Sequence, residues 1–110
     1  MFVKQVSVFL ENRLGRLAMV ARTLANNNID ISAMALADTT NFGILRMIVN
    51  DPDRAVEVLR EAEFTVSTND VLAVEVNDRP GGLAQVLEVL QGNNISIEYA
   101  YSFIKRSGDK

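Results

Sequence analysis

The sequence contains no cysteine and no histidine. Without cysteine the chain forms neither disulfides nor thiolate metal sites, which fits a cytoplasmic protein. Without histidine it has no Ser-His-Asp triad and no histidine-ligated zinc or iron site. It also lacks the side chain that most often transfers protons near neutral pH. We therefore expect no metal, no cofactor and no enzymatic activity, and we expect the chain in the cytoplasm.

Long hydrophobic runs and clusters of basic residues are also missing. No segment approaches the roughly 20 apolar residues that span a bilayer, and the start of the chain lacks the basic leader of a signal peptide. The net charge is −3 and the pI is about 4.8, with 11 scattered lysines and arginines. Such a chain offers no basic stripe to phosphates, so we expect neither a nucleic acid nor a membrane as partner.

An internal repeat organises the 110 residues. Residues 11–20 (ENRLGRLAMV) align with residues 77–86 (NDRPGGLAQV) at an offset of 81 − 15 = 66 residues. The same offset pairs Asn27-Asn28-Ile29 with Asn93-Asn94-Ile95 without a gap. Because one register holds across several elements, we interpret the chain as two tandem copies, residues 1–68 and residues 69–110.

The first copy predicts two helices and four strands. Alternation over residues 5–10 predicts a strand, and Leu14, Leu17, Ala21 and Leu24 have the spacing of an amphipathic helix that the asparagines at 26–28 end. The remaining expectations are a strand from Ile29 to Ala35, a strand at 44–49, a helix that begins at Asp51-Pro52 and buries Val56, Leu59 and Ala62, and a strand at 64–67. This order predicts an α+β fold of the ferredoxin-like βαββαβ type, an antiparallel sheet with both helices on one face.

The second copy begins at Val71 and is expected to be incomplete. We predict a strand on Leu72, Val74 and Val76, a turn at 77–82, a helix on Leu83, Val86, Leu87 and Leu90, and a strand from Ile95 to Ile104. A turn sequence at 107–109 then stands where the hairpin to a third strand should begin. A third strand, a second helix and a fourth strand have no counterpart in these residues.

The strand at 44–49 is apolar on both faces except at Arg46. A sheet with helices on one side should alternate apolar and polar residues, so we expect its other face to be covered as well. Tyr99, Tyr101 and Phe103 share one face of the last predicted strand, where plain core packing is the simplest explanation. Together these features favour association through sheets or sheet edges, and hence a homodimer.

The segment at 77–87 (NDRPGGLAQVL) resembles the turn that opens the first helix of ACT domains, often an Asp-Arg-Pro-Gly-x-Leu-Ala run. Residues 11–18 are a looser version, with Asn12 and Leu14 where aspartate and proline are usual. The chain is similar to small stand-alone tandem ACT-domain proteins. The resemblance implies a module that binds a free amino acid between ACT units and regulates a metabolic enzyme.

A glycine at a helix start permits close approach of a ligand, and the first N–H groups of the helix attract an anion. An α-carboxylate is therefore expected at the amides near Gly15 or Gly81. Tight turns for the glycines, helix capping by Asn12 and Asp78, and solvation of Arg13 and Arg79 are the structural alternatives. The resemblance alone implies that the residues at the helix-to-strand joints, just after the two helices, make secondary contacts with the ligand. The candidate ligand-binding residues are Asn12, Arg13, Leu14, Gly15, Arg16, Asn28, Ile29, Asp78, Arg79, Pro80, Gly81, Gly82, Leu83, Asn94 and Ile95.

Three classes of function remain open. The first is the amino-acid-binding regulatory module, one version of which is the small subunit of acetolactate synthase. The second is a dimerisation or protein-interaction module that keeps the fold without a ligand, which Leu14, Arg16 and the incomplete second copy favour. The third is an enzyme on a ferredoxin-like scaffold, against which stand the missing histidine, nucleophile motif and phosphate-binding loop.

Overall fold

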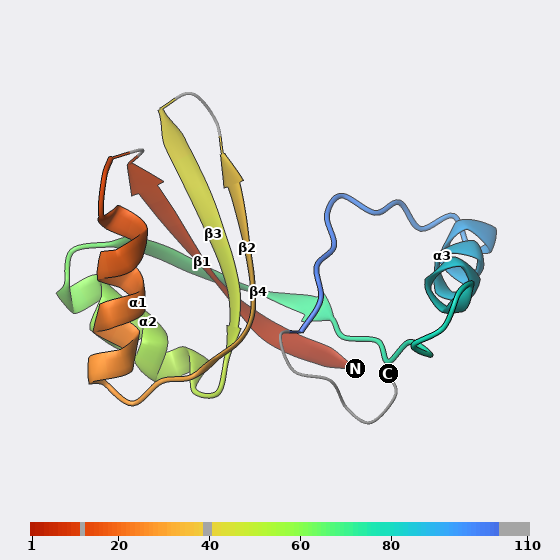
Figure 1. The fold of residues 1–110 in the computed structure, drawn as a ribbon, viewed down its shortest axis with the longest axis horizontal. Helices are drawn as coiled ribbons and strands as arrows, with labels where there is room; N and C mark the ends of the chain where they lie inside the picture. The colour runs from red at the N-terminus through yellow and green to blue at the C-terminus, as the bar shows by residue number, and fades with distance from the viewer. Residues whose placement is uncertain (12, 39–40, 104–110) are drawn as a thin grey trace.

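The computed structural model describes residues 1–11, 13–38 and 41–103. Most of the elements expected from the sequence are present, and Figure 1 shows them as two lobes. The elements in chain order are β1 (Phe2–Glu11), α1 (Arg16–Asn26), β2 (Ile31–Asp38), β3 (Phe42–Val49), α2 (Pro52–Glu61), β4 (Thr65–Leu72) and α3 (Gly82–Gly92).

The first six elements form the expected ferredoxin-like βαββαβ fold. The sheet has the strand order β2-β3-β1-β4 and every neighbouring pair is antiparallel. Helices α1 and α2 lie side by side on one face of this sheet (Figure 1). Asp51 is the N-cap of α2, as expected, and its side chain accepts a hydrogen bond from the N–H of Arg54 at 3.2 Å.

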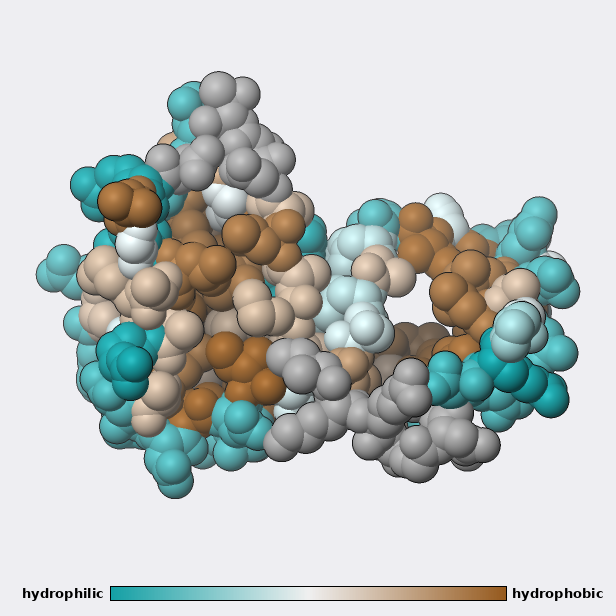
Figure 2. Space-filling view, in the orientation of Figure 1, coloured by the Kyte–Doolittle hydropathy of each residue, from teal (hydrophilic) through white to brown (hydrophobic). Residues whose placement is uncertain are grey.

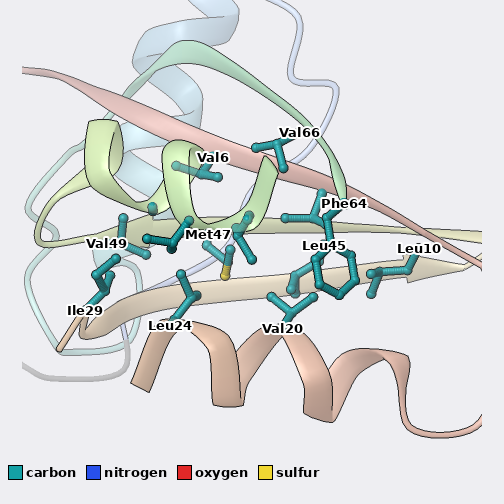
Figure 3. Close-up of a cluster of buried hydrophobic side chains, with 14 residues drawn as sticks. Val6, Leu10, Val20, Leu24, Ile29, Leu45, Met47, Val49, Phe64 and Val66 are labelled. Atoms are coloured by element: carbon teal, nitrogen blue, oxygen red, sulfur yellow. The ribbon is translucent and has the colours of Figure 1, made fainter. Parts of the chain in front are cut away.

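The hydrophobic core of the described residues lies between the sheet and these two helices (Figure 3). Successive residues of a strand point to opposite faces, so every second residue of β1 and β3 enters the core. Full burial of one such side chain stabilises the fold by about 1.5–3 kcal/mol. The core residues are Val6, Val8, Leu10, Val20, Leu24, Ile29, Leu45, Met47, Val49, Ala55, Val58, Leu59, Phe64 and Val66.

Strand β4 is longer than the sequence pattern predicted. The expected strand ended at residue 67, whereas β4 continues to Leu72 because the N-terminal part of β1 offers it pairing partners as far as Phe2. The N–H of Ala73 then donates to the carbonyl oxygen of Met1 at 2.8 Å. Val71, the predicted start of the second copy, thus pairs with Val3 in the first sheet.

A β-bulge interrupts the regular alternation of faces in β2. Ile29, expected in the strand, precedes it and is buried in the core. Ile31 pairs with Val49 but Ala33 pairs with Ile48, so the irregularity between them places them on opposite faces. Met34, which pairs with the core residue Met47, consequently points to the helix side of the sheet.

The predicted buried stripes of the two helices are partly wrong. In α1 the buried residues are Val20 and Leu24, while Leu14 precedes the helix and is fully exposed. Leu14, Leu17 and Ala21 line an open pocket instead of the core. In α2 the buried residues are Ala55, Val58 and Leu59, and Ala62 is exposed at the end of the helix.

The second copy contains its predicted helix but not its predicted strands. Among the elements that the structure describes, α3 packs against none. Residues 73–81 contain no strand, and the only ladder contact described in residues 95–103 is an isolated bridge between Phe103 and Ala33. Ile104 lies outside the described residues. A strand needs a hydrogen-bonded neighbour, and the described part of this copy offers no third strand between the two segments.

Candidate functional site

A pocket of about 820 Å³ lies between α1 and β2, beside the first strand–helix turn. Figure 2 shows mostly hydrophobic residues on the surface between these two elements. Three of the expected site residues, Arg13, Leu14 and Gly15, line the pocket at the turn. The other lining residues are Leu17, Ala18, Val20 and Ala21 from α1, Ile31 and Met34 from β2, and Leu45 from β3.

The backbone at this turn depends on Gly15. Its φ of 85° lies in the left-handed region, and a Cβ at this position would meet nothing within 4 Å. The glycine therefore serves the turn conformation and at the same time leaves open space in front of it. No side-chain hydrogen bond caps α1 in the described part of the chain, whereas Asp51 caps α2, and the N–H of Arg16 donates to the carbonyl oxygen of Arg13 at 3.3 Å.

Arg13 is held at the rim of the pocket by Glu11. Its Nε lies 3.0 Å from Oε2 of Glu11, and its backbone N–H donates to the carbonyl oxygen of Glu11 at 2.8 Å. Both side chains are more than half exposed, so this ion pair contributes little to stability. The guanidinium has further N–H donors on its two terminal nitrogens, which suit a carboxylate.

Arg16 points away from this pocket. Its guanidinium stacks on the ring of Phe64, 4.6 Å from the ring centre. It lines a smaller pocket of about 160 Å³ with Phe9, Glu11, Phe42, Glu63 and Thr65. The structure therefore separates Arg16 from Arg13 and Gly15, with which the sequence grouped it.

Asn28 and Ile29 lie at the opposite end of α1 from the pocket. Asn28 has the left-handed φ of 60° expected of an asparagine that ends a helix. The N–H of Ile29 donates to the carbonyl oxygen of Leu24 at 3.0 Å, and its side chain belongs to the core. Both residues thus have structural roles here. Asn12, the remaining candidate of this copy, lies outside the described residues.

The second turn repeats the backbone of the first in the other lobe. Gly81 has a φ of 87°, Asn94 has a φ of 59°, and the N–H of Ile95 donates to the carbonyl oxygen of Leu90 at 2.9 Å. Gly82 is buried, and a Cβ on it would overlap the carbonyl oxygen of Asn77. The close backbone packing of the turn therefore requires a glycine at this position.

The candidates of the second turn remain on the surface. The exposed ones are Asp78, Arg79, Pro80, Gly81, Leu83, Asn94 and Ile95. The structure does not bring them to the first turn, because α3 and the segments beside it form a separate lobe (Figure 1).

Sequence reasoning missed the apolar walls of the pocket. Nothing in the local sequence singles out Met34, because a bulge leaves no local mark in an alternating pattern. Ala18 is repeated as Ala84 in the second copy, and this repetition was the one signal that could have drawn attention to it.

A polar cluster lies on the sheet face opposite the helices. The Gln5 side chain, 1% exposed, donates from Nε2 to Oη of Tyr99 and to Oδ1 of Asn69, both at 3.0 Å. The Arg46 guanidinium lies 4.0 Å from the centre of the Tyr99 ring. This face is therefore partly covered, as its two-sided apolarity predicted, and the cover comes from the segment that contains the two tyrosines.

The two phenols of this cluster have pKa values displaced in opposite directions. Hydrogen bonds with Asn69 and then Gln5 lower the pKa of Tyr99, and the charge of Arg46 adds to this effect. Burial raises the pKa of Tyr101, and the nearby Tyr99 raises it further.

Within residues 1–11, 13–38 and 41–103 no group of three or more acidic, cysteine or histidine side chains could hold a metal ion. None of the helices in these ranges is long and apolar enough to cross a membrane.

Comparisons with known proteins identify the architecture. The family model of an ACT domain pair matches residues 1–109. The crystal structure of protein BT0572 from Bacteroides thetaiotaomicron is 46% identical, with a TM-score of 0.90 over 96% of this chain and 73% of that chain. A formyltetrahydrofolate deformylase from Burkholderia mallei is 15% identical, with a TM-score of 0.49 over 88% of this chain and 39% of that chain, a likeness that carries no argument here. A comparison with curated proteins finds no match. On the family match and the fold, the chain belongs to the ACT domain pair family.

Proposed function

We propose that this chain is a non-catalytic regulatory module that binds a free amino acid in the pocket beside the first turn and modulates a metabolic enzyme. ACT domains are typically regulatory and bind amino acid effectors. The observation that carries the proposal is the open pocket between α1 and β2, which begins at Arg13 and Gly15. Its volume of about 820 Å³ lies in the range of roughly 300–1,000 Å³ that small-molecule sites occupy.

The lining supports an amino acid with an apolar side chain. The α-carboxylate would bind at the rim, where the guanidinium of Arg13 and the uncapped N-terminus of α1 both favour an anion. The side chain would contact Leu17, Met34 and Leu45, since Arg13 is the only charged residue among the lining residues. Aliphatic or thioether side chains suit this surface, whereas a charged side chain would be desolvated without a partner.

The second turn is a further candidate site. Gly81 and the N-terminus of α3 repeat the backbone of the first turn, and α3 likewise has no side-chain cap in the described residues. Asp78 and Arg79 stand beside it as polar contacts for an amino acid. The first turn has the stronger support because helix and sheet together form a pocket there.

Association of two chains would complete the first site. The pocket is open to solvent, and its rim carries the fully exposed Leu14 and the partly exposed Leu17 and Met34. Leu36, half exposed, lies on the same side of edge strand β2. A second chain that packs here would close the pocket and cover the edge, so we propose a homodimer in the cytoplasm.

A thermal-shift screen of the chain against the twenty amino acids tests the proposal. A ligand that binds only the native state raises the melting temperature. At a free ligand concentration of about 100 times Kd, binding stabilises the native state by about 2.7 kcal/mol. We expect a shift with aliphatic amino acids or methionine. Ala18→Phe, which fills the pocket, should remove the shift that the first site gives, and Ala84→Phe at the equivalent position of α3 tests the second turn in the same way.

The alternative function is a protein-interaction module without a ligand. The exposed Leu14 at the turn favours it, because an apolar side chain there suits a protein surface better than a polar effector. Sedimentation of the same sample distinguishes the two. A stable dimer that shifts with no amino acid at millimolar concentration would favour the interaction module over the effector site.

A further inference from the structure

The proposed amino-acid site provides for two of the three groups of its ligand. Arg13 and the N-terminus of α1 would receive the α-carboxylate, and the apolar walls would receive the side chain. The α-ammonium group also needs a partner, because a cation that leaves water without an opposite charge is unfavourable. The described residues that line the pocket include no acidic side chain. A partner of opposite charge therefore has to come from just beyond this lining.

Glu11 is the acidic residue next to the rim of the pocket. Its Oε2 lies 3.0 Å from Nε of Arg13, so a negative and a positive group stand side by side. An amino acid has the same arrangement, because its α-carboxylate and α-ammonium groups are attached to one carbon atom. A ligand carboxylate on the terminal nitrogens of Arg13 can thus place the ammonium group near Glu11.

The surroundings of this ion pair favour the same orientation of the ligand. The N-terminus of α1, which begins at Arg16, attracts the carboxylate and repels the ammonium group. The side chains of Glu11 and Arg13 are 55% and 65% exposed, so they hold each other weakly and can turn without disturbing the core. A carboxylate and a guanidinium are therefore available together at one side of the pocket.

The internal repeat keeps an acid near the arginine in both turns. Residues 11–13 are Glu-Asn-Arg, and the equivalent residues 77–79 are Asn-Asp-Arg. The acid and the asparagine have exchanged places, whereas the three residue types are the same and one acid still balances one arginine. The presence of the acid is thus more constant than its position, which supports a joint role of carboxylate and guanidinium at the turn.

We infer that Glu11 receives the α-ammonium group, and that it makes the first site selective for an amino acid over the α-oxo acid with the same side chain. This role of Glu11 rests on the proposed function, since it concerns the ligand of the same pocket. An α-oxo acid retains the carboxylate and the side chain but has no ammonium group. Its negative charge is not offset, so Glu11 repels it.

Glu11→Gln tests this role because it removes the charge and keeps the size of the side chain. Isothermal titration calorimetry gives the dissociation constants of leucine, methionine and their α-oxo acids. Every chain in the series carries Arg79→Ala, which removes the arginine of the second turn. We expect the parent chain to prefer each amino acid to its oxo acid, and Glu11→Gln to reduce this preference by about tenfold or more.

Two further variants make the comparison specific. Glu63→Gln, which removes an exposed acid at the joint between α2 and β4, is the matched control and should keep the preference. Glu11→Asn should lose it. Glu11→Asn combined with Asn12→Asp gives the first turn the residue order of the second and should restore it.

An unchanged preference in Glu11→Gln would contradict this role of Glu11, while binding of the amino acid would still support the proposed function. An equal loss of affinity for amino acid and oxo acid would also contradict it, because damage to the turn or to Arg13 weakens both ligands alike. Failure of leucine and methionine to bind the parent chain would contradict the role of Glu11 and the proposed function together.

Discussion

Tyr101 donates its phenol proton to the side-chain oxygen of Gln5 at 2.5 Å, across 96 residues of sequence. The amide of the same Gln5 donates to Tyr99 at 3.0 Å. One buried glutamine of β1 therefore holds the end of the second copy against the first sheet. Since buried polar groups need partners, this contact specifies where that segment lies as well as stabilising it.

Gln5→Leu should destabilise the chain by about 1–3 kcal/mol, because it leaves the hydroxyls of Tyr99 and Tyr101 without their buried partner. Urea denaturation followed by tyrosine fluorescence measures the loss. Gln85→Leu, at an exposed position of α3, is the control and should change stability little. Equal effects of the two substitutions would show that the cluster does not hold the segment.

The two phenols should ionise in separate steps. The chain has two tyrosines and no tryptophan, so phenolate absorbance reports on Tyr99 and Tyr101 alone. The pKa of Tyr99 lies below 10.0 and that of Tyr101 above it. The fold favours the neutral form of Tyr101, so that contribution to stability is complete below the unfolded pKa and is lost as the pH rises through the folded pKa. The contribution of Tyr99 has the opposite pH dependence. It is present above the unfolded pKa and is lost as the pH falls through the folded pKa.

Tyr99→Phe and Tyr101→Phe assign the two steps. Removal of Tyr99 should leave only the later ionisation, and removal of Tyr101 only the earlier one. A single step at the pKa of free tyrosine in the native chain would mean that the cluster is not formed in solution.

Gly15→Ala should cost about 1–2 kcal/mol of stability, since its positive φ is unfavourable for a residue with a Cβ. The open space around Gly15 rules out a steric clash as the cause. Gly92→Ala, also in open space but without a positive φ, is the matched change and should be neutral or stabilise by about 0.4–1 kcal/mol. Thermal unfolding of the two variants compares them directly.

Equivalent leucines of the two copies should differ sharply in importance. Leu24→Ala removes a completely buried side chain and should cost about 2–5 kcal/mol. Leu90→Ala, at the equivalent position of the unpacked α3, should cost less than about 1 kcal/mol in the 110-residue chain. Chemical denaturation gives both values, and a large cost at Leu90 would mean that α3 is already covered.

Much of the fold was predictable because its signals are local. The left-handed Asn28, the Asp51 cap and the glycine of each turn are each determined within a few residues of sequence. What could not be predicted depends on distant partners. The length of β4 depends on pairing with Phe2, and the wall of the pocket at Met34 depends on a bulge between Ile31 and Ala33.

The candidate site was predictable to a similar extent. The turn residues Arg13, Leu14 and Gly15 were identified from the repeat and the resemblance, and they do line one pocket. Arg16 was grouped with them by its place in the sequence, but its side chain packs on Phe64 from the distant helix–strand joint between α2 and β4. Gln5 carries no local mark of its role, because its partners Tyr99 and Tyr101 lie in the other copy.

The two turn–helix segments keep one backbone shape in two different surroundings. Their glycines have φ of 85° and 87°, and the asparagines that end them have φ of 60° and 59°. Yet α1 packs on a sheet and α3 packs on no described element. The backbone conformation of each segment is therefore determined by its own residues and not by its surroundings. An exchange of residues 15–28 and 81–94 is therefore expected to preserve the backbone of each helix while it changes the surface side chains of each lobe.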